Sequence, residues 1–218
     1  MRHFDYVLFD LDGTLLDTRE GVLSAAIYTM RKYNRDIPDK VTLESMIGPP
    51  IQISFQKLYG LSDESAMEMS NVFREAYMME KYLFNAIPYN GIYDLFDNLL
   101  KRGTRIGIAT YKREDYAIRL LCKKGFNYYT NYMYGADFDG KLTKADIIRK
   151  CLSGMGCSEL SKAVYIGDGP SDGKGADEVG VCFIAVTYGF GFKTAEDTLR
   201  FKPVAIADSC KQLKNILL

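Results

Sequence analysis

Phe4–Thr14, with the sequence FDYVLFDLDGT, joins a short apolar run to a turn that carries two acids. The run Phe4–Asp10 has the character of a buried strand, and Asp-Gly is a common turn dipeptide. Asp10 and Asp12 stand two residues apart, so both carboxylates can face one small volume while Leu11 turns away. Converging oxygen ligands suit Mg²⁺. Acids at the end of a strand also often just face solvent, so the pentapeptide by itself leaves both interpretations open.

Similar apolar runs recur along the chain, and they predict further strands at Arg105–Thr110, Ala163–Gly167, Val181–Thr187 and, more weakly, Val204–Ala207. Segments of helical length and three-to-four apolar spacing lie between them, at Ile92–Lys101, Glu114–Lys123, Lys144–Leu152, Ser171–Val179 and Cys210–Leu217. Strands that alternate with helices predict an α/β fold with a doubly wound parallel sheet, covered on both faces. Such folds bind ligands at the carboxyl ends of their strands.

One stretch interrupts this alternation, because from Asp17 to about Asn85 the apolar spacing is helical throughout. The candidate helices are Asp17–Lys32, Leu43–Met46, Ile51–Tyr59 and Ser65–Tyr82, with breaks at Pro38 and at Gly48-Pro49-Pro50. We therefore predict an α/β core from residues 1–15 and 86–218, and an inserted all-helical domain from residues 16–85.

A second acidic cluster follows the predicted strand that ends at Gly167. Asp168 comes directly after this strand, and Asp172 follows four residues later. If the strands are parallel neighbours, these acids lie at the same sheet edge as Asp10. Carboxylates without nearby lysines would repel one another, so a divalent cation is their natural counter-charge. Asp172 could also cap the helix that follows it.

Two further residues are of the kind that a phosphate group needs. Thr110 places a hydroxyl at the end of its predicted strand, and Lys144 opens a helix as a fixed positive charge. A single threonine or lysine usually has a structural explanation. Here the order along the chain is carboxylate pair, hydroxyl, lysine, carboxylate pair, each at a strand end or helix start. This order indicates a phosphate site.

With these motifs the chain resembles the haloacid dehalogenase-like (HAD) hydrolases that carry a helical cap after the first motif, over essentially its whole length. The family's four motifs have their counterparts, in order, at Asp10–Thr14, Thr110, Lys144 and Gly167–Asp172. The phrases Ile47–Pro50 and Asp139–Asp146 are most similar to phosphoglycolate phosphatase-like and 5′-nucleotidase-like members.

The resemblance implies a Rossmann-like catalytic core, a cap over residues 16–85 and a Mg²⁺-dependent phosphatase. Asp10 would attack phosphorus and form an aspartyl-phosphate. Asp12 would protonate the leaving oxygen and then activate the attacking water. Thr110, Lys144 and backbone amides after Asp10 would hold the phosphate oxygens.

The implied Mg²⁺ site consists of Asp10, Asp12 and Asp168, with Asp12 contributing its backbone carbonyl. Asp172 would act from further out, by orienting a metal-bound water. The substrate would be a small phosphorylated metabolite. Cap contacts to it are expected from Gly48, Pro49, Gln52 and Ser54.

Two positions depart from the family pattern. Tyr111 stands where the family commonly has asparagine or serine, and Gly169 stands where a larger side chain is frequent. Both departures bear on substrate identity more than on chemistry.

Two alternative functions stay open from the sequence. A sugar-phosphate mutase would share every core residue and differ only in the cap. A non-enzymatic receiver-like module would also place acids and a lysine around Mg²⁺, but receivers lack an insert of this size.

Composition excludes several other classes of protein. The 218 residues include 28 Lys and Arg against 28 Asp and Glu, and 47% are hydrophobic, as in an ordinary globular protein. Without excess positive charge a nucleic-acid or membrane-surface partner is disfavoured. Five cysteines with no CxxC pair indicate reduced thiols, and no signal peptide is recognisable. We therefore expect a cytoplasmic monomer or homodimer.

Overall fold

The computed structural model describes residues 3–218. The chain divides into two compact units, of which one comprises Met1–Asp17 with Pro88–Leu218 and the other Thr18–Ile87. Both dividing points fall two residues after the boundaries expected from the sequence. Their roles as catalytic core and cap stay predictions.

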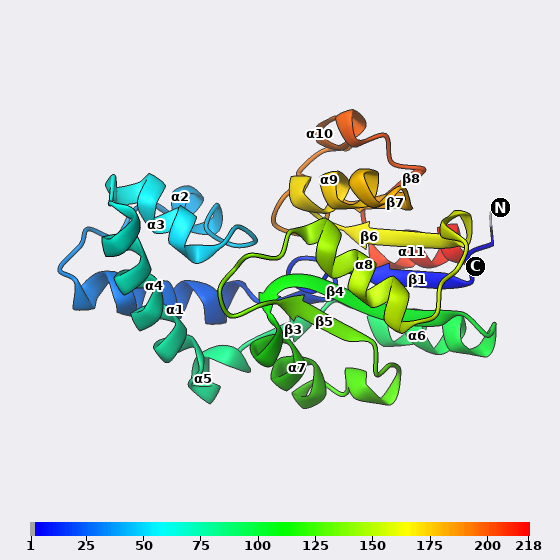
Figure 1. Cartoon of the computed structure of the whole chain (residues 1–218), viewed down its shortest axis with the longest axis horizontal. Coiled ribbons are helices and arrows are strands. Elements are labelled where there is room, and N and C mark those ends of the chain that lie inside the picture. Colours follow the sequence, from blue (N-terminus) through cyan, green and yellow to red (C-terminus); the bar gives the residue numbers. More distant parts are fainter. Residues whose placement is uncertain (1–2) are drawn as a thin grey trace. The chain divides into compact units, whose positions relative to one another are not determined.

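The first unit is built on a six-stranded parallel sheet with the order β5-β4-β1-β6-β7-β8 (Figure 1). The strands are β1 (Tyr6–Phe9), β4 (Arg105–Arg113), β5 (Met133–Ala136), β6 (Ala163–Gly167), β7 (Cys182–Val186) and β8 (Ala205–Ala207). The central strand β1 is paired on both sides, with Phe9 opposite Ile108 of β4 and Ile166 of β6. The chain therefore leaves β1 and β6 at the same carboxyl edge, which confirms the predicted doubly wound parallel sheet.

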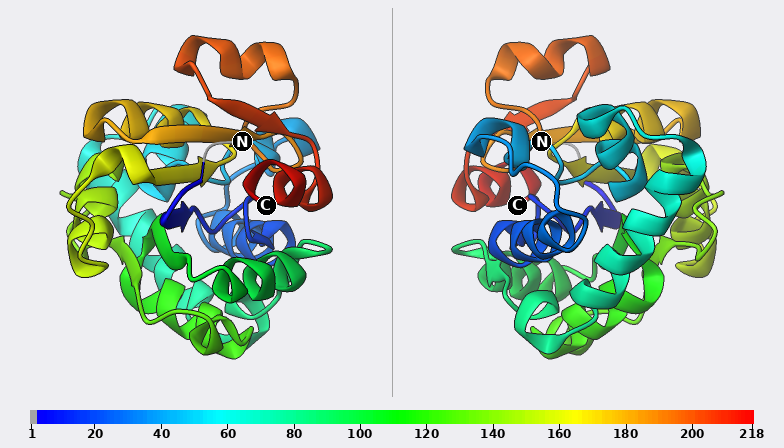
Figure 2. Two further views of the ribbon diagram at one scale, coloured as in Figure 1. Left: turned by 90° about the vertical axis from the view of Figure 1, so that its right-hand side faces the viewer. Right: turned by 90° about the vertical axis from the view of Figure 1, so that its left-hand side faces the viewer.

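Helices cover both faces of this sheet (Figures 1 and 2). They are α6 (Ile92–Lys101), α7 (Glu114–Lys123), α8 (Lys144–Gly154), α9 (Pro170–Val179) and α11 (Cys210–Leu217), whereas the short α10 (Ala195–Thr198) lies away from the sheet. Alternate residues of each strand face opposite layers. Leu8 and Tyr165 pack with Ile147 of α8, whereas the ring of Phe9 lies 4.9 Å from that of Phe96 on α6. Figure 2 shows α8 (yellow) and α11 (red) on opposite sides of the sheet.

Three local expectations were wrong. Strand β5 (Met133–Ala136) was not predicted, because its four residues, MYGA, include a glycine and a tyrosine and do not form a continuous aliphatic run. Strand β4 continues to Arg113, so Thr110 does not end it. The helix expected over Ser65–Tyr82 is two helices, because Met79 is extended (φ −66°, ψ 134°) and begins a new one without a glycine or proline.

The second unit consists of helices, which Figure 1 draws in blue to teal. They are α1 (Arg19–Lys32), α2 (Lys40–Glu44), α3 (Ile51–Tyr59), α4 (Asp63–Tyr77) and α5 (Glu80–Leu83). Its core includes Phe73 of α4, whose ring stacks on Tyr77 at 5.5 Å and meets Phe55 of α3 edge-on at 6.4 Å. The two chain segments that join the units form the short strands β2 (Leu16–Asp17) and β3 (Ile87–Pro88), which pair with each other.

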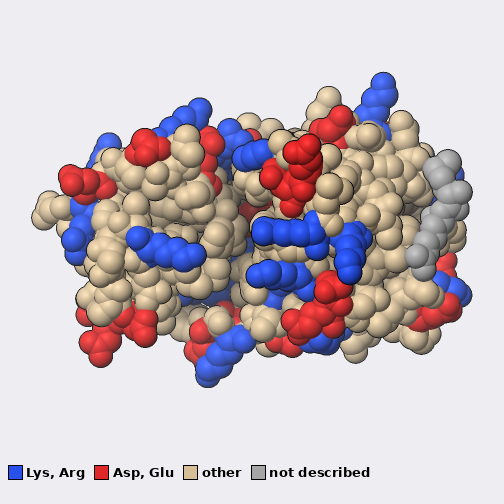
Figure 3. Space-filling view, turned by 90° about the horizontal axis from the view of Figure 1, so that it is seen from above, with Lys and Arg blue, Asp and Glu red and all other residues tan. Residues whose placement is uncertain are grey.

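The surface carries both signs of charge. On the face in Figure 3, Lys and Arg side chains (blue) are interspersed with Asp and Glu (red), and neither sign covers the face. Within residues 3–218, no helix combines the length and the apolar character needed to cross a membrane.

A capping box fixes the start of α8 and can be tested directly. The Thr143 hydroxyl accepts the amide of Asp146 (3.1 Å), and the Asp146 carboxylate accepts the amide of Thr143 (3.0 Å). We expect Thr143→Ala to lower the free energy of unfolding in urea by about 1 kcal/mol. Thr143→Ser keeps the hydroxyl and should lower the free energy of unfolding by at most about 0.3 kcal/mol. Equal losses in the two variants would show that the hydroxyl does not stabilise the helix start.

Candidate active site

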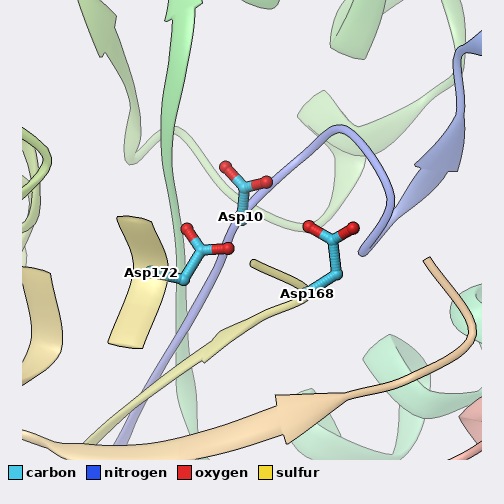
Figure 4. Close-up of side chains that lie close together, drawn as sticks. All are labelled: Asp10, Asp168 and Asp172. Atoms are coloured by element: carbon cyan, nitrogen blue, oxygen red, sulfur yellow. The ribbon is translucent and has the colours of Figure 1, made fainter. Parts of the chain in front are cut away.

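Three buried carboxyl groups meet at the carboxyl edge of the sheet (Figure 4). Asp10 follows β1, Asp168 follows β6, and Asp172 is the third residue of α9. One ligand oxygen from each lies within 4.8 Å of the others, and each residue is at most 5% exposed. Segments more than 150 residues apart in the sequence therefore place their acids in one small volume, as the parallel register of β1 and β6 requires.

Lys144, the first residue of α8, lies inside this cluster. Its Nζ is 2.6 Å from Asp10 Oδ1 and 2.8 Å from Asp172 Oδ1. From the sequence we expected Lys144 to hold a phosphate group at this edge, and the structure shows that it also pairs directly with two of the acids. The three carboxylates and one ammonium still carry an excess of two negative charges when all are ionised.

This excess is visible in the pKa values of the acids. Burial raises the pKa of Asp10 to about 7; Lys144 opposes this rise, and the negative charge of the neighbouring Asp172 contributes to it. Burial and the charge of Asp172 raise the pKa of Asp168 to about 8. Burial disfavours a charged Lys144, but the carboxylates of Asp10 and Asp172 prevail and hold its pKa above the usual value.

The hydrogen bonds show which oxygens could bind a cation. Asp168 Oδ2 accepts the amides of Phe190 (2.6 Å) and Gly191 (3.0 Å), and Asp10 Oδ1 accepts from Lys144. The second oxygen of Asp10 and that of Asp168 accept no hydrogen bond from any residue between 3 and 218. Both oxygens of Asp172 are engaged, as the next paragraph describes.

Asp172 is tied to its own helix and to β6. Its Oδ2 accepts the amide of Gly169 at 2.9 Å, and its Oδ1 meets Lys144 and the Tyr165 hydroxyl (3.3 Å). Gly169 is the N-cap of α9, so Asp172 is not the N-cap residue itself but secures the same turn from the third position. These bonds favour the outer role expected for Asp172 over direct metal ligation.

The arrangement fits a divalent cation. Two buried carboxylate oxygens without hydrogen bonds, from Asp10 and Asp168, face a region of excess negative charge, and hard oxygen ligands of this kind suit Mg²⁺. The backbone allows no extra atoms here: Gly13 has a φ of 82°, and a Cβ on it would collide with the carboxylate of Asp168. The glycine is therefore required both by the turn and by the close approach of these two segments.

Asp12 does not join the carboxylate cluster but forms a second ion pair. Its Oδ2 lies 3.0 Å from Nζ of Lys112 on β4. The backbone amide of Lys112 in turn donates to the hydroxyl of Thr110, which is buried. Asp12 and Thr110, which were expected at the site from the sequence, are thus linked through Lys112, which was not expected there.

Tyr111 also has a role that sequence reasoning missed. Its hydroxyl accepts the amide of Lys144 at 2.9 Å, and the Lys144 ammonium lies 5.3 Å from the centre of its ring.

The alternation of side chains along a strand is the signal that could have indicated Lys112, because residues two apart point the same way: Lys112 shares the direction of Thr110, while Tyr111 points the other way. Nothing in the sequence indicates the amides of Phe190 and Gly191 that hold Asp168.

The four predicted substrate contacts belong to the helical unit. Gly48 has a φ of 100° and precedes the exposed Pro49, while Gln52 is half-buried and Ser54 is buried on α3. Their contact with a substrate stays a prediction.

Comparisons with known proteins agree on one family. A profile described as haloacid dehalogenase-like hydrolase matches residues 7–186. A 5′-nucleotidase of Pseudomonas aeruginosa is 35% identical over 195 residues, which are 89% of this chain and 86% of that protein. A tyrosine-protein kinase PtkA of Mycobacterium tuberculosis is 28% identical over 97% of this chain and 72% of its own. The crystal structure of a predicted phosphatase from Clostridium acetobutylicum superimposes with a TM-score of 0.90, at 31% identity and 99% coverage of both chains.

The raised pKa of Asp168 leads to a prediction for the metal-free protein. Because its folded pKa (about 8) exceeds the ordinary value of 3.8, its ionisation costs stability, and this cost is complete above pH 8 and absent below about pH 4. Asp168→Asn keeps an oxygen for the amides of Phe190 and Gly191 but removes the charge. We expect its melting temperature at pH 8.5 with chelator to exceed that of the wild type by about 3 °C or more.

Two further measurements complete this test. The gain should shrink at pH 5.5, and Mg²⁺ should raise the melting temperature of the wild type but not that of Asp168→Asn. The control is Asp177→Asn, which removes an exposed acid from the same helix, α9, and should behave like the wild type. A lower melting temperature for Asp168→Asn under all conditions would contradict the electrostatic account.

Proposed function

We propose, because the chain belongs to the haloacid dehalogenase-like hydrolases, that it is a phosphatase that hydrolyses small phosphate monoesters through a phosphorylated Asp10. The observation that carries the proposal is the buried group of Asp10, Asp168 and Lys144 at the carboxyl edge of the sheet. Residues 1–15 and 86–218 would form the catalytic core, and residues 16–85 the cap.

Asp10 is the proposed nucleophile. Lys144 holds its Oδ1 at 2.6 Å and so fixes the plane of the carboxylate, while the other oxygen stays outside this ion pair. Its pKa of about 7 means that the metal-free carboxyl is only partly ionised at neutral pH, and attack requires the ionised form. Mg²⁺ on Asp10, Asp168 and the carbonyl of Asp12 would keep Asp10 ionised and offset the charge of the phosphate.

Asp12 is the proposed acid and base. It would donate a proton to the leaving oxygen as the ester bond breaks, and later accept one from the water that attacks the phosphorylated Asp10. Thr110 and Lys144 would hold the phosphoryl oxygens, with Lys144 moving part of its hydrogen bonding from Asp172 to the substrate. Asp172 would keep Lys144 and the start of α9 in place.

The proposed substrate class is drawn from the named relatives and from two short phrases of the sequence. The similarity to a relative named 5′-nucleotidase supports nucleoside monophosphates as substrates of this chain. The phrases Ile47–Pro50 and Asp139–Asp146 resemble those of phosphoglycolate phosphatases and support phosphoglycolate as well. One relative carries the name of a protein kinase, so the acceptor of the phosphoryl group needs to be tested as well. Gly48, Pro49, Gln52 and Ser54 are the proposed specificity residues.

The proposal is tested by phosphate release from a panel of esters with Mg²⁺. The panel contains nucleoside 5′-monophosphates, phosphoglycolate, sugar phosphates and pyrophosphate, with a tyrosine-containing peptide added as a competing acceptor. We expect many turnovers per chain with water as acceptor, and none after chelation. A single turnover would indicate a receiver-like module, an isomerised sugar phosphate would indicate a mutase, and a labelled peptide would indicate a kinase.

The nucleophile is tested by Asp10→Asn, which is isosteric but cannot attack phosphorus. Release of phosphate should fall by roughly three orders of magnitude or more, with the far-ultraviolet circular dichroism unchanged. In a rapid acid quench, the wild type but not the variant should carry an acid-stable, hydroxylamine-labile phosphoryl group. Turnover near that of the wild type would remove Asp10 from the mechanism.

The proton transfer is tested by Asp12→Asn. The rate on alkyl esters should fall by roughly 10²–10⁴-fold, because an amide cannot exchange the proton. The loss should be much smaller for p-nitrophenyl phosphate, whose leaving group needs little protonation. Mg²⁺ affinity should change little, since only the backbone carbonyl of Asp12 would contact the metal. Equal losses on both kinds of ester would assign Asp12 a purely structural or electrostatic role.

A further inference from the structure

Lys112 is a lysine near the site that the proposed mechanism does not use. It lies on β4, two residues after Thr110, and its side chain is 6% exposed. Burying an ammonium group is costly unless a partner compensates it. Asp12, 12% exposed, provides such a partner at 3.0 Å.

We propose that Lys112 is a positioning residue that holds the carboxylate of Asp12 in the orientation from which it exchanges a proton with the leaving group. This inference rests on the proposed function of Asp12. It adds a residue outside the four motifs to the machinery of the reaction.

The two sides of this ion pair differ in how firmly they are held. Lys112 belongs to a strand that pairs with β1 and β5, and its own amide donates to the Thr110 hydroxyl at 3.2 Å. Asp12 lies on the turn between β1 and β2, where its side chain could rotate about two bonds. The strand therefore fixes the backbone of Lys112, and the enclosed side chain presents its ammonium group to the carboxylate of the turn. The contact is made by Oδ2 of Asp12.

The charges around the site are divided in the same way. Lys144 contacts Asp10 and Asp172, whereas Lys112 contacts Asp12. The carboxylate that must stay ionised as nucleophile and the carboxylate that must exchange a proton thus have separate cationic partners. Without Lys112, Asp12 would lose the positive charge at 3.0 Å that opposes its repulsion by the neighbouring carboxylate of Asp10.

Two other roles for Lys112 predict different kinetics. A lysine that binds the phosphate directly would mainly affect KM, and would do so whether or not Asp12 is intact. A lysine that only stabilises the fold would lower the melting temperature without a dependence on the leaving group. A positioning residue affects kcat, depends on the leaving group, and loses its effect when Asp12 can no longer exchange a proton.

The test is a double-mutant cycle of Lys112→Met and Asp12→Asn, with Lys112→Arg as the conservative control. The substrates are p-nitrophenyl phosphate and the fastest alkyl ester of the panel. We expect Lys112→Met to lower kcat on the alkyl ester by about 10²-fold, the loss typical of a misplaced catalytic group, with KM within about threefold. The loss on p-nitrophenyl phosphate should be several times smaller. In the Asp12→Asn background the same substitution should have little further effect.

Lys112→Arg should recover most of the lost rate, since a guanidinium keeps the charge and the hydrogen bond to Asp12. If Lys112→Met does not fold, Lys112→Gln takes its place in the cycle, because its shorter neutral amide does not restore the ion pair. Losses that multiply in the double variant, or an equal rise of KM in both backgrounds, would overturn the inference while leaving the phosphatase intact. A wild-type chain that hydrolyses no ester would instead overturn the proposed function, and this inference with it.

Discussion

The structure depends on the burial of like charges at one edge of the sheet. Asp10, Asp168 and Asp172 are kept within 4.8 Å of one another by elements that are themselves fully packed, so the carboxylates cannot separate to relieve their repulsion. Lys144 compensates part of the charge, two backbone amides hold Asp168, and the first turn of α9 holds Asp172. The remaining negative charge raises the affinity of the site for protons or for a cation. In the proposed function, this excess of negative charge would favour the binding of a metal ion and, with it, of a phosphate group.

Around this cluster the neighbouring residues control orientation. The Thr143 cap and the Tyr111 hydroxyl fix the first turn of α8, and thereby the root of the Lys144 side chain. Lys144 is long and unbranched, and a free lysine loses much rotamer entropy when it is immobilised. Anchoring the backbone of Lys144 and burying its side chain reduces the number of positions that its ammonium group can reach. In this chain Tyr111 replaces the small polar residue common in the family, and it contacts the lysine.

Much of this architecture could be predicted from the sequence, because it follows from local patterns. The strands are apolar on both faces, so the parallel sheet and its carboxyl edge could be inferred, and with them the approach of Asp10 to Asp168. The pairing of Lys144 with Asp10 and Asp172 could not, since it depends on where a long side chain ends. For the same reason Lys112 could not be assigned to Asp12. Strand β5 was missed because its glycine and its tyrosine obscure the apolar pattern, and the break at Met79 was missed because no residue there disfavours a helix.

The parallel register of β1 has a consequence for how the chain matures. The strand is made first but is central, and it pairs with β4 and β6, which lie about 100 and 160 residues later in the sequence. Such long-range pairing requires closure of large loops, which slows folding. Because Asp168 follows β6 and Asp172 lies on α9, the acid cluster around Asp10 is incomplete until these later segments have been synthesised. The unusual proton affinity of Asp10 therefore arises only when the last third of the chain has folded. A shortened chain that ended before α9 would retain the nucleophilic carboxylate, but that group would titrate like any solvated aspartate.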